Sequence, residues 1–220
     1  MTRRPVEPVA AHCGIDMSLK PVSDTMWAYR MMAHTARITS FIYGDGSKDI
    51  SEWHQLWQYI KDWNNRKPES FKPIYHGRST LPANHPVSSS PDSATESQLP
   101  RIYFTYDCPL AGLQYMQLSK ILLLAHDPHR PFLGPGRDTY HRSQEEEIRE
   151  AVRIICGAAL ANPEYEPARL TAGMAVAMCG ELFSDPRETP ELYRIVSEAE
   201  THMMWPSLMI AKRLKVFWEL

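Results

Sequence analysis

The sequence lacks the features that define several protein classes. No apolar run reaches the roughly 18 to 20 residues that a membrane-spanning helix needs, and the N-terminus has no apolar core of the kind found in secretion signals. We therefore expect an intracellular protein without a membrane contact. A formal net charge of -2 gives no overall field that would draw the chain to nucleic acid or to an anionic bilayer.

Cysteine is also scarce. Cys13, Cys108, Cys156 and Cys179 are far apart and form no CxxC pair, so a zinc site built from cysteines is not expected. Cys156 and Cys108 are candidate nucleophiles, but no neighbouring residue identifies a base. Buried, reduced structural thiols are the preferred interpretation. Glycine-rich phosphate loops and nucleophile elbows are missing as well.

What the sequence does contain is helical periodicity over most of its 220 residues, of which 43% are hydrophobic and 23% charged. A chain of this size and composition can bury one sizeable core. The only predicted strand is Arg101 to Thr105, so the predicted class is all-α, a single helical bundle. Seven helices are expected, at about 26–43, 49–67, 110–126, 143–161, 167–183, 189–203 and 205–218.

The stretch from Leu110 to His126 is predicted to be the buried central helix of this bundle. Its apolar residues fall at alternating steps of four and three and then spread around the last turns, so other helices should cover it on most sides. Gln114, Gln117 and Lys120 form the one polar strip. The second helix carries an aromatic stripe, Trp53, Trp57 and Trp63, which we interpret as core rather than as a base-stacking or ligand surface.

The domain organisation follows from composition. Residues 1–22 are expected to be a flexible N-terminal arm, and residues 23–220 a helical domain. The proline-rich stretch 64–100 should contain a mobile loop at about 77–98, with its apolar flanks pinned to the helical body. Ser143 and Glu146 have the spacing of a capping box, and the acidic Glu145 to Glu147 would then lie in a solvated first helical turn.

One group of polar residues resembles a metal site. His126, Asp127, His129 and nearby His141 carry ligand types that bind divalent metals. The alternative, which we prefer, is a solvated connector in which His126 simply lies at a helix C-terminus. In the last helix, Leu214, Phe217 and Trp218 are expected to point inward, and both Trp205 and Trp218 to be core residues.

Four segments together resemble one family, the fungal-specific transcription factor domain that follows the binuclear zinc cluster in many fungal regulators. The first contains Trp53, Leu56, Trp63, Pro68, Phe71 and Pro73; the second is Tyr115 to His126; the third is Ile155 to Asn162; and the fourth contains Trp205, Pro206, Ser207, Leu214 and Trp218. The resemblance covers roughly residue 23 to the C-terminus. The paired cysteine clusters of that family's DNA-binding module are missing, since only Cys13 lies in the N-terminal region.

This resemblance implies a nuclear transcription regulator that acts through protein partners, full-length zinc cluster regulators among them, in the control of a specialised-metabolism gene cluster. Homo-oligomerisation is a further expectation. No catalytic, cofactor-binding, metal or DNA-binding residue is predicted, and no direct nucleic-acid binding. The alternative is a small-molecule-binding helical protein or enzyme of fungal specialised metabolism, whose interior, with 11 methionines in the chain, would enclose a ligand.

Overall fold

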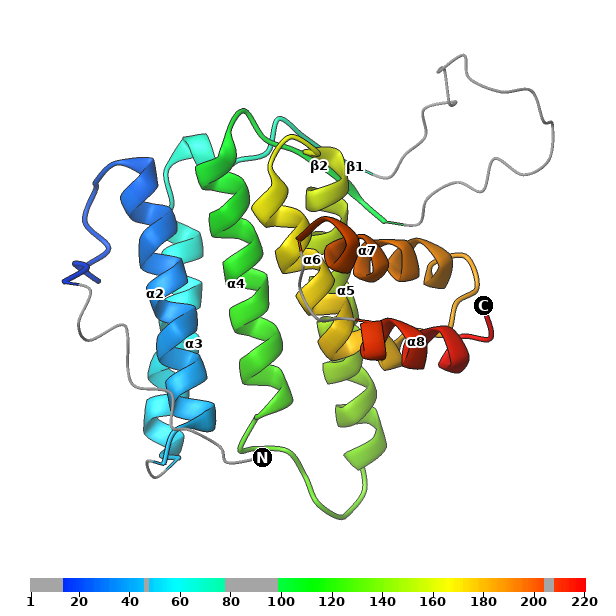
Figure 1. Ribbon diagram of the computed structural model, residues 1–220. Helices are drawn as coiled ribbons and strands as arrows, with labels where there is room; N and C mark the ends of the chain where they lie inside the picture. The colour runs from blue at the N-terminus through cyan, green and yellow to red at the C-terminus, as the bar shows by residue number, and fades with distance from the viewer. Residues whose placement is uncertain (1–13, 46–47, 78–98, 204–207) are drawn as a thin grey trace.

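Helices make up most of the computed structural model (Figure 1). It describes residues 14–45, 48–77, 99–203 and 208–220, without the side chains of 200–203 and 208. Within these residues the all-α class and the predicted seven helices are confirmed. The elements are α2 (Asp24–Tyr43), α3 (Ile50–Arg66), η1 (Glu69–Phe71), β1 (Tyr75–Gly77), β2 (Arg101–Tyr103), α4 (Asp107–Ala125), α5 (Arg137–Ala161), α6 (Glu166–Cys179), η2 (Gly180–Leu182), α7 (Thr189–Met203) and α8 (Leu208–Phe217).

Helix α4 is the central helix, as predicted, and it separates two hydrophobic cores. One core lies between α4 and the pair α2 and α3, and includes Met116 and Leu123 of α4. The other lies between α4 and the helices α5 to α8, and includes Leu110 and Ile121. Figure 1 shows α4 standing between these two groups, with α7 and α8 lying across α5 and α6. Because the two cores share α4, the chain folds as one body around this helix.

The prediction that Gln114, Gln117 and Lys120 form a polar strip on α4 is wrong for two of the three residues. Gln114 and Gln117 are 1% and 5% exposed, so two of its three members lie inside the protein. Gln114 Nε2 donates to the carbonyl oxygens of Ile155 on α5 and Ala168 on α6, each at 3.1 Å. A buried amide of this kind is stable because its donor is satisfied, and here it joins three helices.

The tryptophans of α3 pack inward, as predicted for core residues. Trp53 and Trp63 are 7% and 0% exposed. Their indole N–H groups donate to the backbone carbonyls of Leu123 on α4 at 3.2 Å and of Trp27 on α2 at 3.0 Å. The stripe therefore fixes α3 against both of its neighbours. Trp57 is only partly buried.

A two-stranded antiparallel sheet closes one end of the bundle, with Tyr75 opposite Tyr103. The strand predicted from Arg101 to Thr105 is β2, whereas β1 was not predicted from the sequence. Asn162, just after α5, anchors the sheet to the bundle: its Nδ2 donates to the carbonyl of Ile102 at 2.8 Å, and its Oδ1 accepts from the backbone N–H of Phe104 at 3.1 Å.

Helix α5 begins six residues earlier than predicted, at Arg137 rather than Ser143. Gly136, with φ of 88°, forms the turn before it, and the Tyr140 N–H donates to the Gly136 carbonyl at 2.9 Å. The predicted capping box is therefore wrong, because Ser143 lies inside the helix. The reason is tertiary: the first turns of α5 are held by side chains that contact Asp127.

The C-terminal helix is only partly as predicted. Leu214 is buried, but Phe217 is 53% exposed and does not point inward. Trp218 is half-buried against the second core, and its indole N–H donates to the Phe183 carbonyl at 3.0 Å. Trp205 lies outside the described residues.

Part of the predicted N-terminal arm contacts the bundle. Arg30 of α2 is fully buried, and its guanidinium donates to the Asp16 carboxylate at 3.0 Å and to the Lys20 carbonyl at 2.8 Å. Residues 1–13 of the predicted arm and residues 78–98 of the predicted loop lie outside the described residues. Among the helices that the structure describes, none has the length and apolar content required to cross a membrane.

Candidate functional site

The connector between α4 and α5, residues 126–136, holds most of the polar residues that the sequence singled out. Helix α4 ends at Ala125, and His126 Nδ1 lies 3.0 Å from the Leu122 carbonyl, where its N–H can satisfy one of the last free carbonyls of the helix. The chain then turns through Gly134 and Gly136, both with positive φ. It returns as α5, so that the connector lies at one end of the molecule (Figure 1).

Asp127 is the centre of a hydrogen-bonded cluster on this connector. Its carboxylate, whose side chain is 9% exposed, accepts from the Tyr140 hydroxyl, from Gln144 Nε2 at 2.9 Å and from the His129 backbone N–H at 2.8 Å. Tyr140 and Gln144 are one helical turn apart on α5. This spacing explains how one carboxylate can hold the first turns of that helix.

The protonation states of this cluster follow from its contacts. Burial acts to raise the pKa of Asp127, but the hydrogen bonds from Tyr140 and His129 outweigh it, so the pKa lies below its ordinary value. Burial and the hydrogen bond to Asp127 raise the pKa of Tyr140 to about 12. At neutral pH the pair is therefore a carboxylate and a neutral phenol, so the Tyr140 hydroxyl can donate a stabilising hydrogen bond to Asp127.

The connector is also held against α3. The imidazole of His129 lies 2.9 Å from the Asp127 carboxylate, and its ring centroid is 5.4 Å from Trp53 and 4.9 Å from His54. Trp53 in turn stacks on Trp57. His129 thus packs on the edge of the aromatic stripe.

The structure does not bring the four metal-ligand candidates together. His126 packs on Tyr43 with ring centroids 5.6 Å apart, while His141 Nδ1 accepts from Arg130 Nε at 2.9 Å. Only Asp127 and His129 are in contact. Among the residues that the structure describes, no group of three or more His, Cys, Asp or Glu side chains is arranged to hold a metal ion.

Two adjoining cavities open beside the connector. The first, of about 310 Å³, lies between α4, α5 and the end of α6 with η2; its apolar wall includes Ile121, Leu124, Ile148, Met178 and Leu182. The second, of about 300 Å³, is lined by Arg130, Pro131, Phe132, Arg137 and His141. Arg130 and His141 line both cavities. We call the first the apolar groove and the second the basic pocket.

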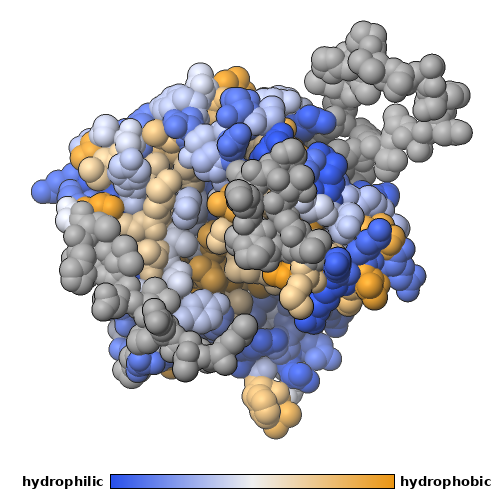
Figure 2. All heavy atoms as spheres, viewed as in Figure 1, coloured by the Kyte–Doolittle hydropathy of each residue, from blue (hydrophilic) through white to orange (hydrophobic). Residues whose placement is uncertain are grey.

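An exposed apolar tip lies next to the basic pocket. Phe132 and Leu133 are 86% and 79% exposed. In Figure 2 the apolar colour protrudes at the bottom of the view, where Figure 1 places the connector. These two neighbouring side chains form one exposed apolar tip on the connector.

The cysteine candidates have the environment of structural thiols. Cys156 is fully buried, and burial raises its pKa well above the ordinary value. Burial likewise raises the pKa of Cys179 to about 12, and it is the main cause that raises the pKa of Cys108. These thiols stay protonated at neutral pH, whereas the thiolate is the nucleophile. Cys13 lies outside the described residues.

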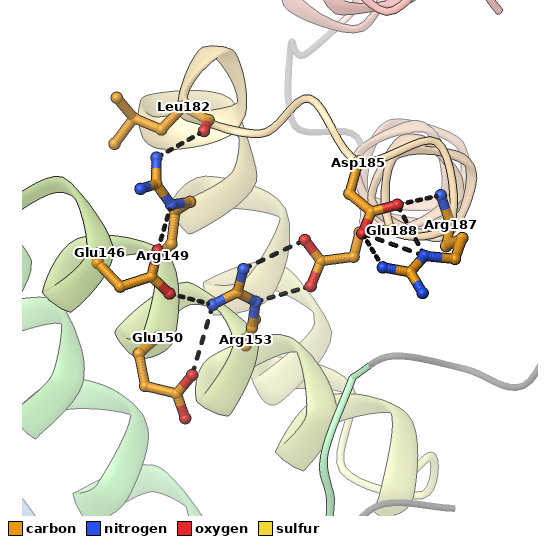
Figure 3. A network of polar contacts seen from close by, with 8 residues as sticks. All are labelled: Glu146, Arg149, Glu150, Arg153, Leu182, Asp185, Arg187 and Glu188. Atoms are coloured by element: carbon orange, nitrogen blue, oxygen red, sulfur yellow. Dashed lines mark hydrogen bonds and ion pairs between the residues drawn. The ribbon is translucent and has the colours of Figure 1, made fainter. Parts of the chain in front are cut away.

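The acidic residues Glu145 to Glu147 lie in the third turn of α5, not in the predicted first turn. Glu146 bridges Arg149 at 2.9 Å and Arg153 at 2.8 Å, and the hydrogen bond from Arg153 lowers its pKa. Figure 3 shows how this network continues to Glu188, whose carboxylate receives both Arg153 Nε at 2.7 Å and Nη2 at 3.3 Å. It fastens α5 to the start of α7.

Several residues of the connector region were not predicted from the sequence: Arg130, Arg137, Tyr140, Gln144 and Met178. The predicted capping box started the helix at Ser143. It therefore left Arg137 and Tyr140 outside the helix and placed Gln144 at its first position. Tyr140 and Gln144 are four residues apart in the sequence. If both are assigned to a helix, this spacing places their side chains on one face.

Comparisons with protein-family models, curated proteins and solved structures give no match.

Proposed function

We propose that this chain is a regulatory and protein-interaction domain of a transcription regulator, of the type found in fungal zinc cluster proteins but without its own DNA-binding module. It acts in the nucleus through protein partners, which include full-length zinc cluster regulators of specialised-metabolism genes. The exposed apolar tip of Phe132 and Leu133 is the contact surface for such a partner.

The observation that carries the proposal is the role of the residues that resemble the family. Trp63 and Phe71 of the first segment lie against Gly112 of α4, where an added Cβ would be 3.1 Å and 2.7 Å from their rings. Within the third segment, Gly157 packs under the Pro100 carbonyl, and Asn162 anchors β2. The residues that resemble the family thus lie where helices and strands pack closely together, and such positions tolerate few side chains. This supports the proposal that the chain shares its fold with that family.

A second observation supports the partner surface. Burial of an exposed Phe and Leu pair in a partner's pocket removes apolar area from water, and each such side chain contributes about 1.5 to 3 kcal/mol when fully buried. Neighbouring Arg130 and Arg137 supply the polar rim that surrounds such anchors in interfaces.

A tethering assay tests the proposal. The chain is fused to a heterologous DNA-binding domain, and transcription of a reporter is measured with and without a co-expressed zinc cluster regulator. We expect a change in reporter output that the double variant Phe132→Ser, Leu133→Ser abolishes without lowering the melting temperature. Met209→Ser, at an 84% exposed methionine on α8, is the matched control. Unchanged output from the tethered wild-type chain contradicts the proposal.

A further inference from the structure

The apolar groove and the basic pocket together have the properties of a ligand site, and this inference goes beyond partner binding. Because Arg130 and His141 line both, the two spaces adjoin. Their volumes, about 310 and about 300 Å³, fall within the range of roughly 300 to 1,000 Å³ that small-molecule sites occupy.

The charges of the site are not balanced. Of the two carboxylates of the groove, Glu181 lies 2.7 Å from Arg213, whereas Glu145 lies 3.8 Å from Arg149, which is also paired with Glu146. By contrast, none of the ion pairs among the described residues involves Arg130 or Arg137. The basic pocket therefore carries two guanidinium groups that are not engaged in an ion pair with a described residue.

A hydrogen bond between Arg130 and His141 fixes the orientation of the Arg130 guanidinium in the basic pocket. Arg130 Nε donates to His141 Nδ1 at 2.9 Å, which places the imidazole proton on Nε2 and leaves the other guanidinium nitrogens of Arg130 to bind a ligand. A guanidinium binds a carboxylate through two parallel N–H donors, which makes it the preferred partner for such an anion.

The opposite end of the site is apolar. Ile121 and Leu124 of α4 form its floor and Ile148 of α5 one side, while Met178, which is 49% exposed, forms the rim on α6. Methionine adapts to irregular apolar shapes. A ligand that fits both ends must have an apolar body and one anionic head.

We propose that this site binds a small amphipathic carboxylic acid, with its carboxylate at Arg130 and Arg137 and its aliphatic or aromatic body in the apolar groove. A partner protein is not required for this binding. The site borders the Phe132 and Leu133 tip, because Phe132 lines the basic pocket, but it recognises a charge and an apolar chain rather than a protein surface.

The test uses the whole chain labelled with 13C at the methionine methyl groups. Octanoate, 4-phenylbutyrate and neutral 1-octanol are titrated while the Met178 and Met209 methyl signals, assigned with Met178→Leu and Met209→Leu, are followed by NMR. We expect a saturable shift of the Met178 signal with both carboxylates and no shift of the Met209 signal. The affinity for 1-octanol should be at least about tenfold lower than that for octanoate, because 1-octanol cannot form a charge-assisted hydrogen bond.

Matched variants separate the charge from the apolar groove. Arg130→Gln should weaken octanoate binding about tenfold and leave 1-octanol binding unchanged, whereas Arg142→Gln, at an exposed arginine of the same region, should change neither. Met178→Trp should fill the groove and abolish binding of all three probes, while Met209→Trp should not. Melting curves of each variant establish that it is folded.

Three results overturn the inference: no saturable Met178 shift with either carboxylate up to about 10 mM, equal affinity for octanoate and 1-octanol, or the same loss from Arg142→Gln as from Arg130→Gln. The reporter assay of the tethered chain does not depend on these results, so failure of the ligand site is distinguishable from failure of the proposed function.

Discussion

Gly157 of α5 approaches Pro100 so closely that an added Cβ would lie 1.9 Å from the Pro100 carbonyl oxygen. The neighbour here is backbone, which cannot move aside as the end of a flexible side chain can. The glycine therefore sets the distance between α5 and the segment that leads into β2.

The first prediction is that Gly157→Ala lowers the free energy of unfolding by about 3 kcal/mol, as overpacking of a core does. In an exposed helix interior the same change would raise stability by about 1 kcal/mol, so the sign of the effect is diagnostic. Urea denaturation of both proteins measures it. A stabilised variant would show that the close approach does not exist in solution.

The second prediction concerns the ion pair of Arg153 and Glu188, whose side chains are 19% and 7% exposed. Glu188→Gln should destabilise the protein by about 2 kcal/mol, because Arg153 keeps its ion pair with Glu146 but loses the buried carboxylate that joins α5 to α7. Asp185→Asn, which removes the more exposed pair with Arg187, should cost less than about 1 kcal/mol. Equal effects in thermal denaturation would contradict the assigned role of Glu188.

The third prediction is a pH dependence that comes from His34. Burial is the main cause that lowers the pKa of His34 from 6.5 to about 4. In the neutral form its Nε2 donates to the Leu56 carbonyl at 3.0 Å, while Nδ1 has no hydrogen-bond partner among the described residues. The unfolded chain therefore binds the proton more tightly than the folded chain.

It follows that the stability due to His34 is fully present above about pH 6.5 and decreases as the pH falls toward 4, by about 3 kcal/mol in total. Urea titrations at several pH values between 4 and 7 measure this slope, and His34→Gln should flatten it because the amide does not titrate. An equally steep slope in the variant would assign the dependence to other groups.

The fourth prediction separates two neighbouring aromatic residues of the C-terminal end. Trp218→Ala should lower the free energy of unfolding by about 2 to 3 kcal/mol, since the half-buried indole packs on Gly180 and donates to Phe183. Phe217→Ala, at a side chain that is 53% exposed, should cost less than about 1 kcal/mol. Unaltered melting of the Trp218 variant would contradict its place in the core.

Local sequence signals predicted the helices well. Ser23 and Asp49 cap α2 and α3 by accepting from the backbone N–H groups of Met26 and Ser51, and the apolar content of α4 predicted its central position. These features depend on residues within one or two helical turns, so a single sequence contains the information.

The remaining features depend on distant contacts. Gln114 is buried because carbonyls of two other helices meet it, and α5 begins early because Asp127 binds Tyr140 and Gln144. The sequence grouped Asp127 and His129 with His126 and His141 on the connector, but it did not indicate the cavities beside them. Arg130 and Met178 come together only when α4, α5 and α6 are packed, and no local spacing encodes that arrangement.

The position of α4 between two cores has a consequence for sequence variation. A surface helix accepts many residues on its outer side, so its tolerance to substitution rises and falls with a period of 3.6 residues. From Leu110 to Leu124, α4 has no exposed residue. A saturation mutagenesis profile of this helix should therefore be uniformly intolerant, whereas α3, with His54, Gln55 and Gln58 exposed, should show the helical period.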